Sequence, residues 1–171
     1  TAVILGADCV MLSEETANGK YPIHAVEVLK RIIMYTQSNM PLAVKYYEVD
    51  TLPPTRQRAI CEAVINLADN VSAKAIVAET KSGAVALQII ALRPNRPLIA
   101  VTSDSRVAQQ LAIVYGTKSY VRPDDKLQAV KLTNWLRQNN VLNKGDMIVS
   151  ATGQHPGVVG TTDTIKVRVL E

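Results

Sequence analysis

Short apolar runs alternate along the chain with longer stretches in which apolar residues recur at helical spacing. From residue 56 onward this succession is regular. The pattern predicts five strands, over residues 73–78, 98–102, 119–121, 147–151 and 164–170. Because strands that alternate with helices form mostly parallel sheets covered on both faces, we expect a three-layer α/β/α sandwich.

The last predicted strand differs from the others, because residues 164–170 alternate apolar and charged side chains. Such alternation is typical of a strand with one wet face, so we expect an edge strand that runs antiparallel to its neighbour. Among the helices, Asp104 is placed to cap the start of one that Gly116 ends, and Pro123–Asp125 is placed to open the next.

The first 40 residues follow a pattern of their own. Asp8–Leu12 is a short apolar run without helical spacing, which predicts a fully buried strand of a parallel sheet. A polar loop over residues 13–20 follows, and Pro22 is placed to start a long helix. We therefore expect three parts, namely a strand–loop–helix segment (residues 1–40), a proline-rich linker (residues 41–55) and an α/β domain (residues 56–171).

The composition is that of a globular protein. Of the 171 residues, 47% are hydrophobic and 20% are charged, and no apolar run reaches the roughly 18 residues of a membrane span. The net charge of +4 comes from scattered basic residues and only 4% of the residues are aromatic, so we expect neither a membrane nor a nucleic acid as a partner. The chain starts at Thr1 without a charged leader, and we expect an excised piece rather than a signal peptide.

Cys9 and Cys61 are the only cysteines in the sequence, and each lies within an apolar run. We therefore expect two buried free thiols in a reducing compartment rather than a disulfide. Two cysteines also exclude the common zinc sites with four cysteine ligands, and we expect no metal site in this chain.

The turn Thr80–Gly83 is the first candidate site. It links a predicted buried strand to a helix, where ligands of open α/β sheets bind and where the N–H groups of a helix start attract anions. The hydroxyls of Thr80 and Ser82, the ammonium of Lys81 and the small Gly83 would suit a phosphate monoester. The alternative is that Ser82 only caps the helix and Gly83 only eases the turn.

A second candidate is the glycine-rich loop over residues 152–163, which follows another strand of the same predicted sheet. It could fold over the Thr80–Gly83 turn and close a pocket, or it could simply connect to the edge strand. The residues that would serve a ligand there are Gly153, His155, Gly160, Thr161 and Thr162.

The third candidate is the cluster of Ser13, Glu15 and Thr16, directly after the predicted strand Asp8–Leu12. Barrel enzymes place active-site residues at this end of their strands, although a helix-capping cluster uses the same residue types. The sequence offers no complete set of acid, base and nucleophile.

Residues 6–22, GADCVMLSEETANGKYP, resemble the last barrel strand of pyruvate kinases and the loop after it. Further segments follow in the order and spacing of that family, namely Thr80–Gly83, residues 98–102, Lys144–Asp146 and Gly160–Asp163. The resemblance covers essentially the whole chain. It implies that residues 1–40 are the last strand and helix of a catalytic TIM barrel, and that residues 56–171 are the C-terminal regulatory domain.

The resemblance also implies an activity of the parent protein. In the family, phosphoenolpyruvate phosphorylates ADP to give pyruvate and ATP with Mg2+ and K+ as cofactors. Ser13, Glu15 and Thr16 match residues that border the active site. The metal-binding carboxylates, the phosphate-binding arginine, the catalytic lysine and the lid domain have no counterpart in this sequence. We therefore expect the chain to be inactive alone and to bind neither ion.

A regulatory role is implied as well. In many members the turn matching Thr80–Gly83 binds a phosphate of a sugar-phosphate activator, and the loop matching Gly153–Thr162 closes over it. Ala84 and Val85 replace polar residues often found there, which favours a sugar monophosphate or a weak site. The family further implies a cytoplasmic homotetramer in which the remainder of the parent chain is a partner. The alternative is a free-standing phosphate-binding or interaction module with no catalytic role.

Overall fold

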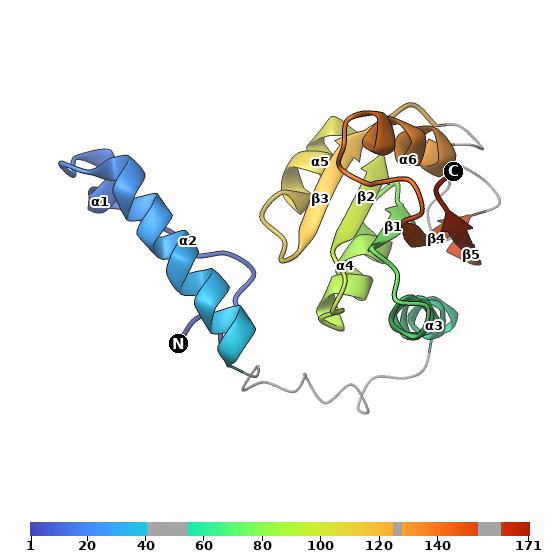
Figure 1. Cartoon of the computed structure of the whole chain (residues 1–171), viewed down its shortest axis with the longest axis horizontal. Coiled ribbons are helices and arrows are strands. Elements are labelled where there is room, and N and C mark those ends of the chain that lie inside the picture. The colour runs from blue at the N-terminus through green and yellow to red at the C-terminus, as the bar shows by residue number, and fades with distance from the viewer. Residues whose placement is uncertain (41–54, 125–127, 154–161) are drawn as a thin grey trace. The chain divides into compact units, whose positions relative to one another are not determined.

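The computed structural model describes residues 1–40, 55–124, 128–153 and 162–171. The chain divides into two compact units, Thr1–Leu52 and Pro53–Glu171, drawn in blue and in green to red in Figure 1. None of the helices that the structure describes is both long and apolar enough to cross a bilayer.

The first unit contains helix α1 (Glu14–Ala17) and the long helix α2 (Pro22–Asn39). Pro22 is the first residue of α2, as predicted, because proline has a helical φ and lacks the N–H group that would have no acceptor there. Residues 1–40 are all described, and none of them is buried. The apolar side chains that α2 leaves exposed are Ile23, Val26, Ile32, Met34 and Tyr35.

The predicted strand Asp8–Leu12 is wrong. Residues 1–40 contain no strand, and this run has irregular backbone. Cys9 is exposed, which corrects the expectation of two buried thiols, whereas Cys61 is buried as expected. A strand needs a neighbouring strand for its backbone hydrogen bonds, and the described residues of this unit provide none.

The second unit is built on a five-stranded sheet with the strand order β3-β2-β1-β4-β5. Its strands are β1 (Ala75–Glu79), β2 (Leu98–Thr102), β3 (Thr117–Val121), β4 (Met147–Gly153) and β5 (Thr162–Val169). The first four are parallel, and β5 runs antiparallel along β4 at the edge, as its alternating pattern predicts. The predicted five-stranded, mostly parallel sheet is therefore confirmed.

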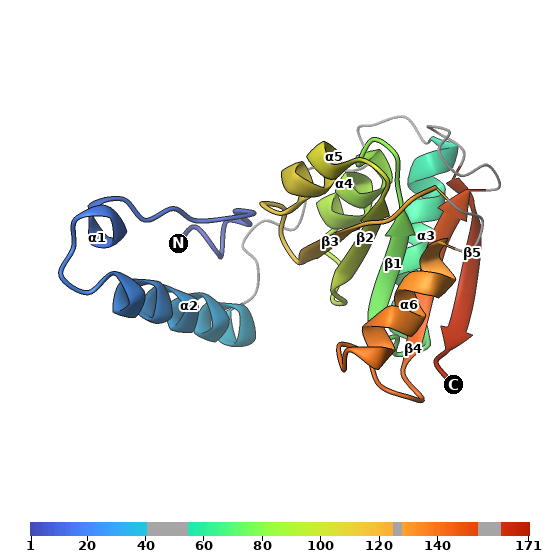
Figure 2. The same ribbon diagram turned by 90° about the horizontal axis from the view of Figure 1, so that it is seen from above.

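Helices cover both faces of this sheet, so the three-layer α/β/α sandwich is confirmed (Figure 2). They are α3 (Arg56–Asn70), α4 (Ala84–Ala91) and α5 (Ser105–Leu111) on one face and α6 (Gln128–Gln138) on the other. Successive residues of a strand point to opposite faces. Ile76 of β1 accordingly packs in the core shared with α3, α4 and α5, and Val77 packs in the core that contains Leu132 of α6.

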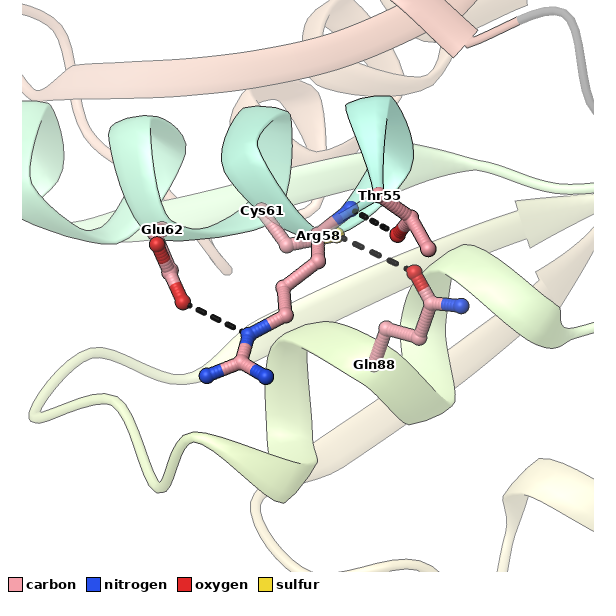
Figure 3. Close-up of polar contacts among 5 residues, drawn as sticks. All are labelled: Thr55, Arg58, Cys61, Glu62 and Gln88. Carbon is pink, nitrogen blue, oxygen red and sulfur yellow. Dashed lines mark hydrogen bonds and ion pairs between the residues drawn. The ribbon is translucent and has the colours of Figure 1, made fainter. Parts of the chain in front are cut away.

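Polar contacts fix the start of α3 and join it to α4 (Figure 3). The Thr55 hydroxyl accepts the backbone N–H of Arg58 at 3.2 Å and so caps α3. One turn along, the Arg58 guanidinium donates to the Glu62 carboxylate at 2.9 Å. The Cys61 thiol donates to the side-chain oxygen of Gln88 in α4 at 3.8 Å, which places a polar contact between two helices that otherwise share an apolar core.

The predicted cap of α5 is also confirmed. The Asp104 carboxylate accepts the backbone N–H groups of Arg106 at 2.8 Å and Val107 at 3.3 Å. The helix ends at Leu111, earlier than the stop predicted at Gly116. Gly116 instead has a positive φ of 58° in the loop that leads into β3.

Candidate functional site

Three polar side chains follow three neighbouring strands of the sheet. Lys81 lies in the turn after β1, Ser103 follows β2 directly, and Asp124 lies shortly after β3. These strands are adjacent and parallel, so their carboxyl ends lie at the same end of the sheet. In open α/β sheets this end is where ligands bind.

The turn Thr80–Gly83 is shaped by one glycine and one hydroxyl. Gly83 has a φ of 84°, a left-handed conformation that side chains disfavour, and it is the N-cap residue of α4. Its backbone N–H donates to the Thr80 hydroxyl at 2.9 Å. Because Gly83 is the N-cap residue and no side chain caps α4, the alternative in which Ser82 caps this helix is wrong.

Lys81 is held by two oxygen atoms. Its ammonium donates to the Ser103 hydroxyl at 2.6 Å and to the Asp124 carboxylate at 3.0 Å. The hydrogen bond from Lys81, followed by one from Ser103, lowers the pKa of the Asp124 carboxyl, which is therefore ionised at neutral pH. The side chains of Lys81 and Asp124 are 36% and 39% exposed, so a ligand in solvent can reach both.

Ser103 and Asp124 were not among the predicted site residues. The sequence pattern assigns Asp124 only to the opening of a helix, and α6 as described begins at Gln128. Ser103 follows β2, which pairs with β1, and Asp124 follows β3, which pairs with β2 in the same parallel arrangement. The rule that ligands bind at the carboxyl ends of adjacent strands could have pointed to them, had the strand order been known.

The second candidate loop is described only at its two ends. Gly153 ends β4 and pairs with Thr162 at the start of β5, beside an irregularity in the ladder. Because β4 is parallel to β1, Gly153 lies at the same end of the sheet as the Thr80–Gly83 turn. Thr162 is buried. The remaining predicted residues, His155, Gly160 and Thr161, lie outside the described part of the chain.

The third candidate is a small hydrogen-bonded cluster at the start of α1. The Ser13 backbone N–H donates to the Glu15 carboxylate at 2.9 Å, and the Thr16 hydroxyl donates to the Ser13 carbonyl at 3.1 Å. Backbone N–H groups of Glu15 and Ser13 lower the pKa of the Glu15 carboxyl. The three residues thus bond to one another, while the Ser13 side chain makes no hydrogen bond that caps α1.

Comparison with known proteins decides the family. The family model described as "Pyruvate kinase, alpha/beta domain" matches residues 58–168, which include most of the second unit and all three residues of the Lys81, Ser103 and Asp124 cluster. The chain belongs to the pyruvate kinase family. The resemblance to the C-terminal part of pyruvate kinase is thereby confirmed, and the matched residues carry the five-stranded sheet.

Individual pyruvate kinases align with nearly the whole chain. Pyruvate kinase 2 of Synechocystis sp. is 33% identical over 173 residues, covering 99% of this chain and 29% of that protein. A pyruvate kinase of Mycobacterium tuberculosis is 34% identical over 171 residues, covering 97% of this chain and 35% of that protein. The crystal structure of a pyruvate kinase from Cryptosporidium parvum superposes with a TM-score of 0.83 at 28% identity, covering 97% of this chain and 34% of that one. The chain therefore spans about a third of the length of the pyruvate kinases it matches.

Proposed function

We propose that this chain is the C-terminal part of a pyruvate kinase that transfers a phosphoryl group from phosphoenolpyruvate to ADP, giving pyruvate and ATP. Residues 1–40 belong to its catalytic barrel, residues 41–55 are a linker, and residues 56–171 form a regulatory domain that binds a sugar phosphate and takes part in subunit assembly. Family membership supports the activity of the complete enzyme. The geometry of the Thr80–Gly83 turn supports the effector site.

The observation that carries the effector proposal is a lysine ammonium beside a helix start. Lys81 lies in the turn before α4, whose intrahelical bonding begins where the Leu87 N–H donates to the Gly83 carbonyl at 3.0 Å. The N–H groups of Ala84–Ala86 precede that bond and carry the partial positive charge of the helix start. A phosphate monoester suits this combination. Ala84 and Val85 add no side-chain donors, which favours a monophosphate and a modest affinity.

Isothermal titration of the full chain tests the effector proposal. Glucose 6-phosphate, ribose 5-phosphate and fructose 1,6-bisphosphate are each titrated into wild type, Lys81→Ala and Lys144→Ala. We expect binding heat from at least one sugar phosphate, weaker binding by Lys81→Ala and unchanged binding by Lys144→Ala. Lys144 is a matched control because it is exposed, carries the same charge and precedes the amino end of β4. Heat from none of the three, or unchanged binding by Lys81→Ala, would contradict the proposal.

Subunit assembly is proposed to use β5. In the described sheet this strand pairs with β4 alone, and its side chains Val167 and Val169 are 44% and 55% exposed. An edge strand with apolar side chains is suited to pairing with a second copy of itself, which would fit the homotetramer that the resemblance implies. Sedimentation velocity over a range of concentrations tests this. We expect association that Val167→Lys weakens, and a monomer at every concentration would speak against it.

The chain alone is proposed to be catalytically inactive. Ser13, Glu15 and Thr16 border the active site of the complete enzyme, and the exposed apolar side chains of α2 suit a helix that the rest of a barrel covers. Among the described residues, no three His, Cys, Asp or Glu side chains are grouped as metal ligands are. The Mg2+ and K+ of the complete enzyme are proposed to bind elsewhere in it, because the metal-binding carboxylates that the resemblance implies have no counterpart in this sequence. An assay of pyruvate formation from phosphoenolpyruvate and ADP with both ions should show no turnover, and turnover would refute this.

A free-standing phosphate-binding module is the second candidate. It is favoured by the core of the second unit, where Val64, Ile89 and Leu132 are fully buried among residues of that unit. The coding sequence upstream of Thr1 separates the two candidates. An in-frame sequence encoding further barrel strands supports the enzyme, whereas a start codon immediately before Thr1 supports the module.

A further inference from the structure

The ion pair between Lys81 and Asp124 joins two positions that are 43 residues apart in the sequence. Asp124 accepts one hydrogen bond from the Lys81 ammonium at 3.0 Å, and Ser103 accepts another at 2.6 Å. An ammonium has three N–H donors, so two of the three are already used. The single lysine of the turn is therefore engaged before any ligand arrives.

Asp124 is the acidic residue that pairs with the Lys81 ammonium. The segment after β2 also carries a carboxylate, that of Asp104, which accepts the backbone N–H groups of Arg106 and Val107 at the start of α5. Capping α5 holds that carboxylate in place. The Oδ2 atom of Asp124 lies 3.0 Å from the Lys81 ammonium.

A phosphate group would use the same positive charge that Asp124 uses. Carboxylates and phosphates both bind lysine through charge-assisted hydrogen bonds, and a phosphate monoester carries about 1.5 to 2 negative charges near neutral pH. If both anions stayed on Lys81, like charges would lie within a few ångströms of each other and repel. Because Lys81 and Asp124 are 36% and 39% exposed, the pair can separate without opening the sheet.

We infer that Asp124 is an internal competitor of the effector phosphate, which binds by taking the Lys81 ammonium from the Asp124 carboxylate. The inference rests on the proposed phosphate binding at the Thr80–Gly83 turn. It adds that competition by Asp124 limits the affinity of that site. The ion pair stabilises the ligand-free state. Each phosphate ligand therefore binds more weakly than it would to the same turn without the Asp124 carboxylate. Binding leaves the carboxylate of Asp124 without its lysine partner.

The substitution Asp124→Asn tests this directly, because it keeps the size of the side chain and removes its charge. Exposed ion pairs alter equilibria by factors of about 1.4 to 5, so the dissociation constant of glucose 6-phosphate should fall by a factor in this range. Asp69→Asn is the matched control. Asp69 pairs with Arg96 at 3.4 Å, is 36% exposed and lies near the amino ends of the strands, so its substitution should leave the dissociation constant unchanged.

A double variant shows whether the effect passes through Lys81. If Asp124 competes for the ammonium, adding Asp124→Asn to Lys81→Met should not tighten binding further. If it tightens binding as much as in the wild-type background, Asp124 acts by repelling the ligand alone and the inference is wrong. Inorganic phosphate, titrated in parallel, should show the same pattern as glucose 6-phosphate because the competition concerns the phosphate group.

The remaining outcomes separate this inference from the proposed function. If wild type binds glucose 6-phosphate, Lys81→Ala weakens it and Asp124→Asn leaves it unchanged, the competition is refuted while the effector site stands. If no variant binds either probe, the effector site is refuted and the competition with it.

Discussion

The backbone N–H of Gly83 donates to the Thr80 hydroxyl at a distance of 2.9 Å. The two residues enclose the turn that carries Lys81, and Thr80 itself is only 8% exposed. A donor that is shielded from water lowers the free energy of unfolding more when it loses its acceptor than a donor that water can reach. This bond therefore links the stability of the turn to the position of the lysine that we propose binds phosphate.

Replacing the Thr80 hydroxyl should destabilise the protein. Thr80→Val keeps the branched shape but leaves the Gly83 N–H without its acceptor, so the free energy of unfolding should fall by about 1–2 kcal/mol. Urea unfolding measures the loss. Thr80→Ser keeps the hydroxyl and should lose less. Equal stability of Thr80→Val and wild type would show that this bond contributes nothing.

A side chain at Gly83 should be costly because of the backbone conformation. The φ of 84° is disfavoured for alanine, and Gly83→Ala should lose about 1–2 kcal/mol of unfolding free energy. A methyl group there would lie 3.4 Å from a Val107 methyl, which is an ordinary contact distance. Gly145→Ala is the control, since Gly145 has a φ of 88° and open space around it. We expect similar losses in both variants, and no loss at Gly83 would contradict the left-handed turn.

Local patterns predict most of the second unit. The sequence signals for the strand over residues 98–102 and for the Asp104 cap come from residues close together in the chain. Both features occur as predicted. The apolar run Asp8–Leu12 gives the same local signal as a buried strand, but a strand also requires a partner for its hydrogen bonds, and periodicity does not show whether one exists. The pairing of Lys81 with Asp124 depends on the order β3-β2-β1, a long-range property that no local pattern contains.

The Cys61 thiol should make stability depend on pH in the alkaline range. Burial, with a smaller effect of the Glu62 charge, raises the pKa of Cys61 to about 11 from its ordinary value of 9.0. The folded state therefore favours the neutral thiol. Its contribution is fully present below pH 9 and is lost as the pH rises from 9 to 11. Between pH 8 and pH 10, wild type should lose roughly 1 kcal/mol more unfolding free energy than Cys61→Ala.

Urea unfolding at pH 8, 9 and 10 tests this difference. Cys61→Ala also removes the contact with Gln88, so it should be less stable at every pH, and only the change with pH is compared. Both proteins carry Cys9→Ser, which removes the exposed thiol from the titration. Parallel stability curves for the two proteins would show that Cys61 ionises as easily in the folded state as in the unfolded chain.

The two thiols should also differ in reactivity. Cys9 is exposed and Cys61 is buried, so a disulfide reagent such as DTNB at pH 8 should modify one thiol of the folded chain rapidly. The second should react only after denaturant is added. Cys9→Ser should abolish the rapid phase and Cys61→Ala should keep it. Rapid modification of both thiols in the folded chain would contradict the burial of Cys61.

Binding of a phosphate group at Lys81 and the start of α4 is tested most directly by an NMR titration of the 15N-labelled chain with glucose 6-phosphate. The amide signals of Ala84, Val85 and Ala86 report on the N–H groups that would face the phosphate. These signals should shift and saturate with one dissociation constant in wild type, and Lys81→Ala should need higher glucose 6-phosphate concentrations for the same shifts. Unchanged signals of these three amides at saturating glucose 6-phosphate in wild type would contradict the proposed effector site.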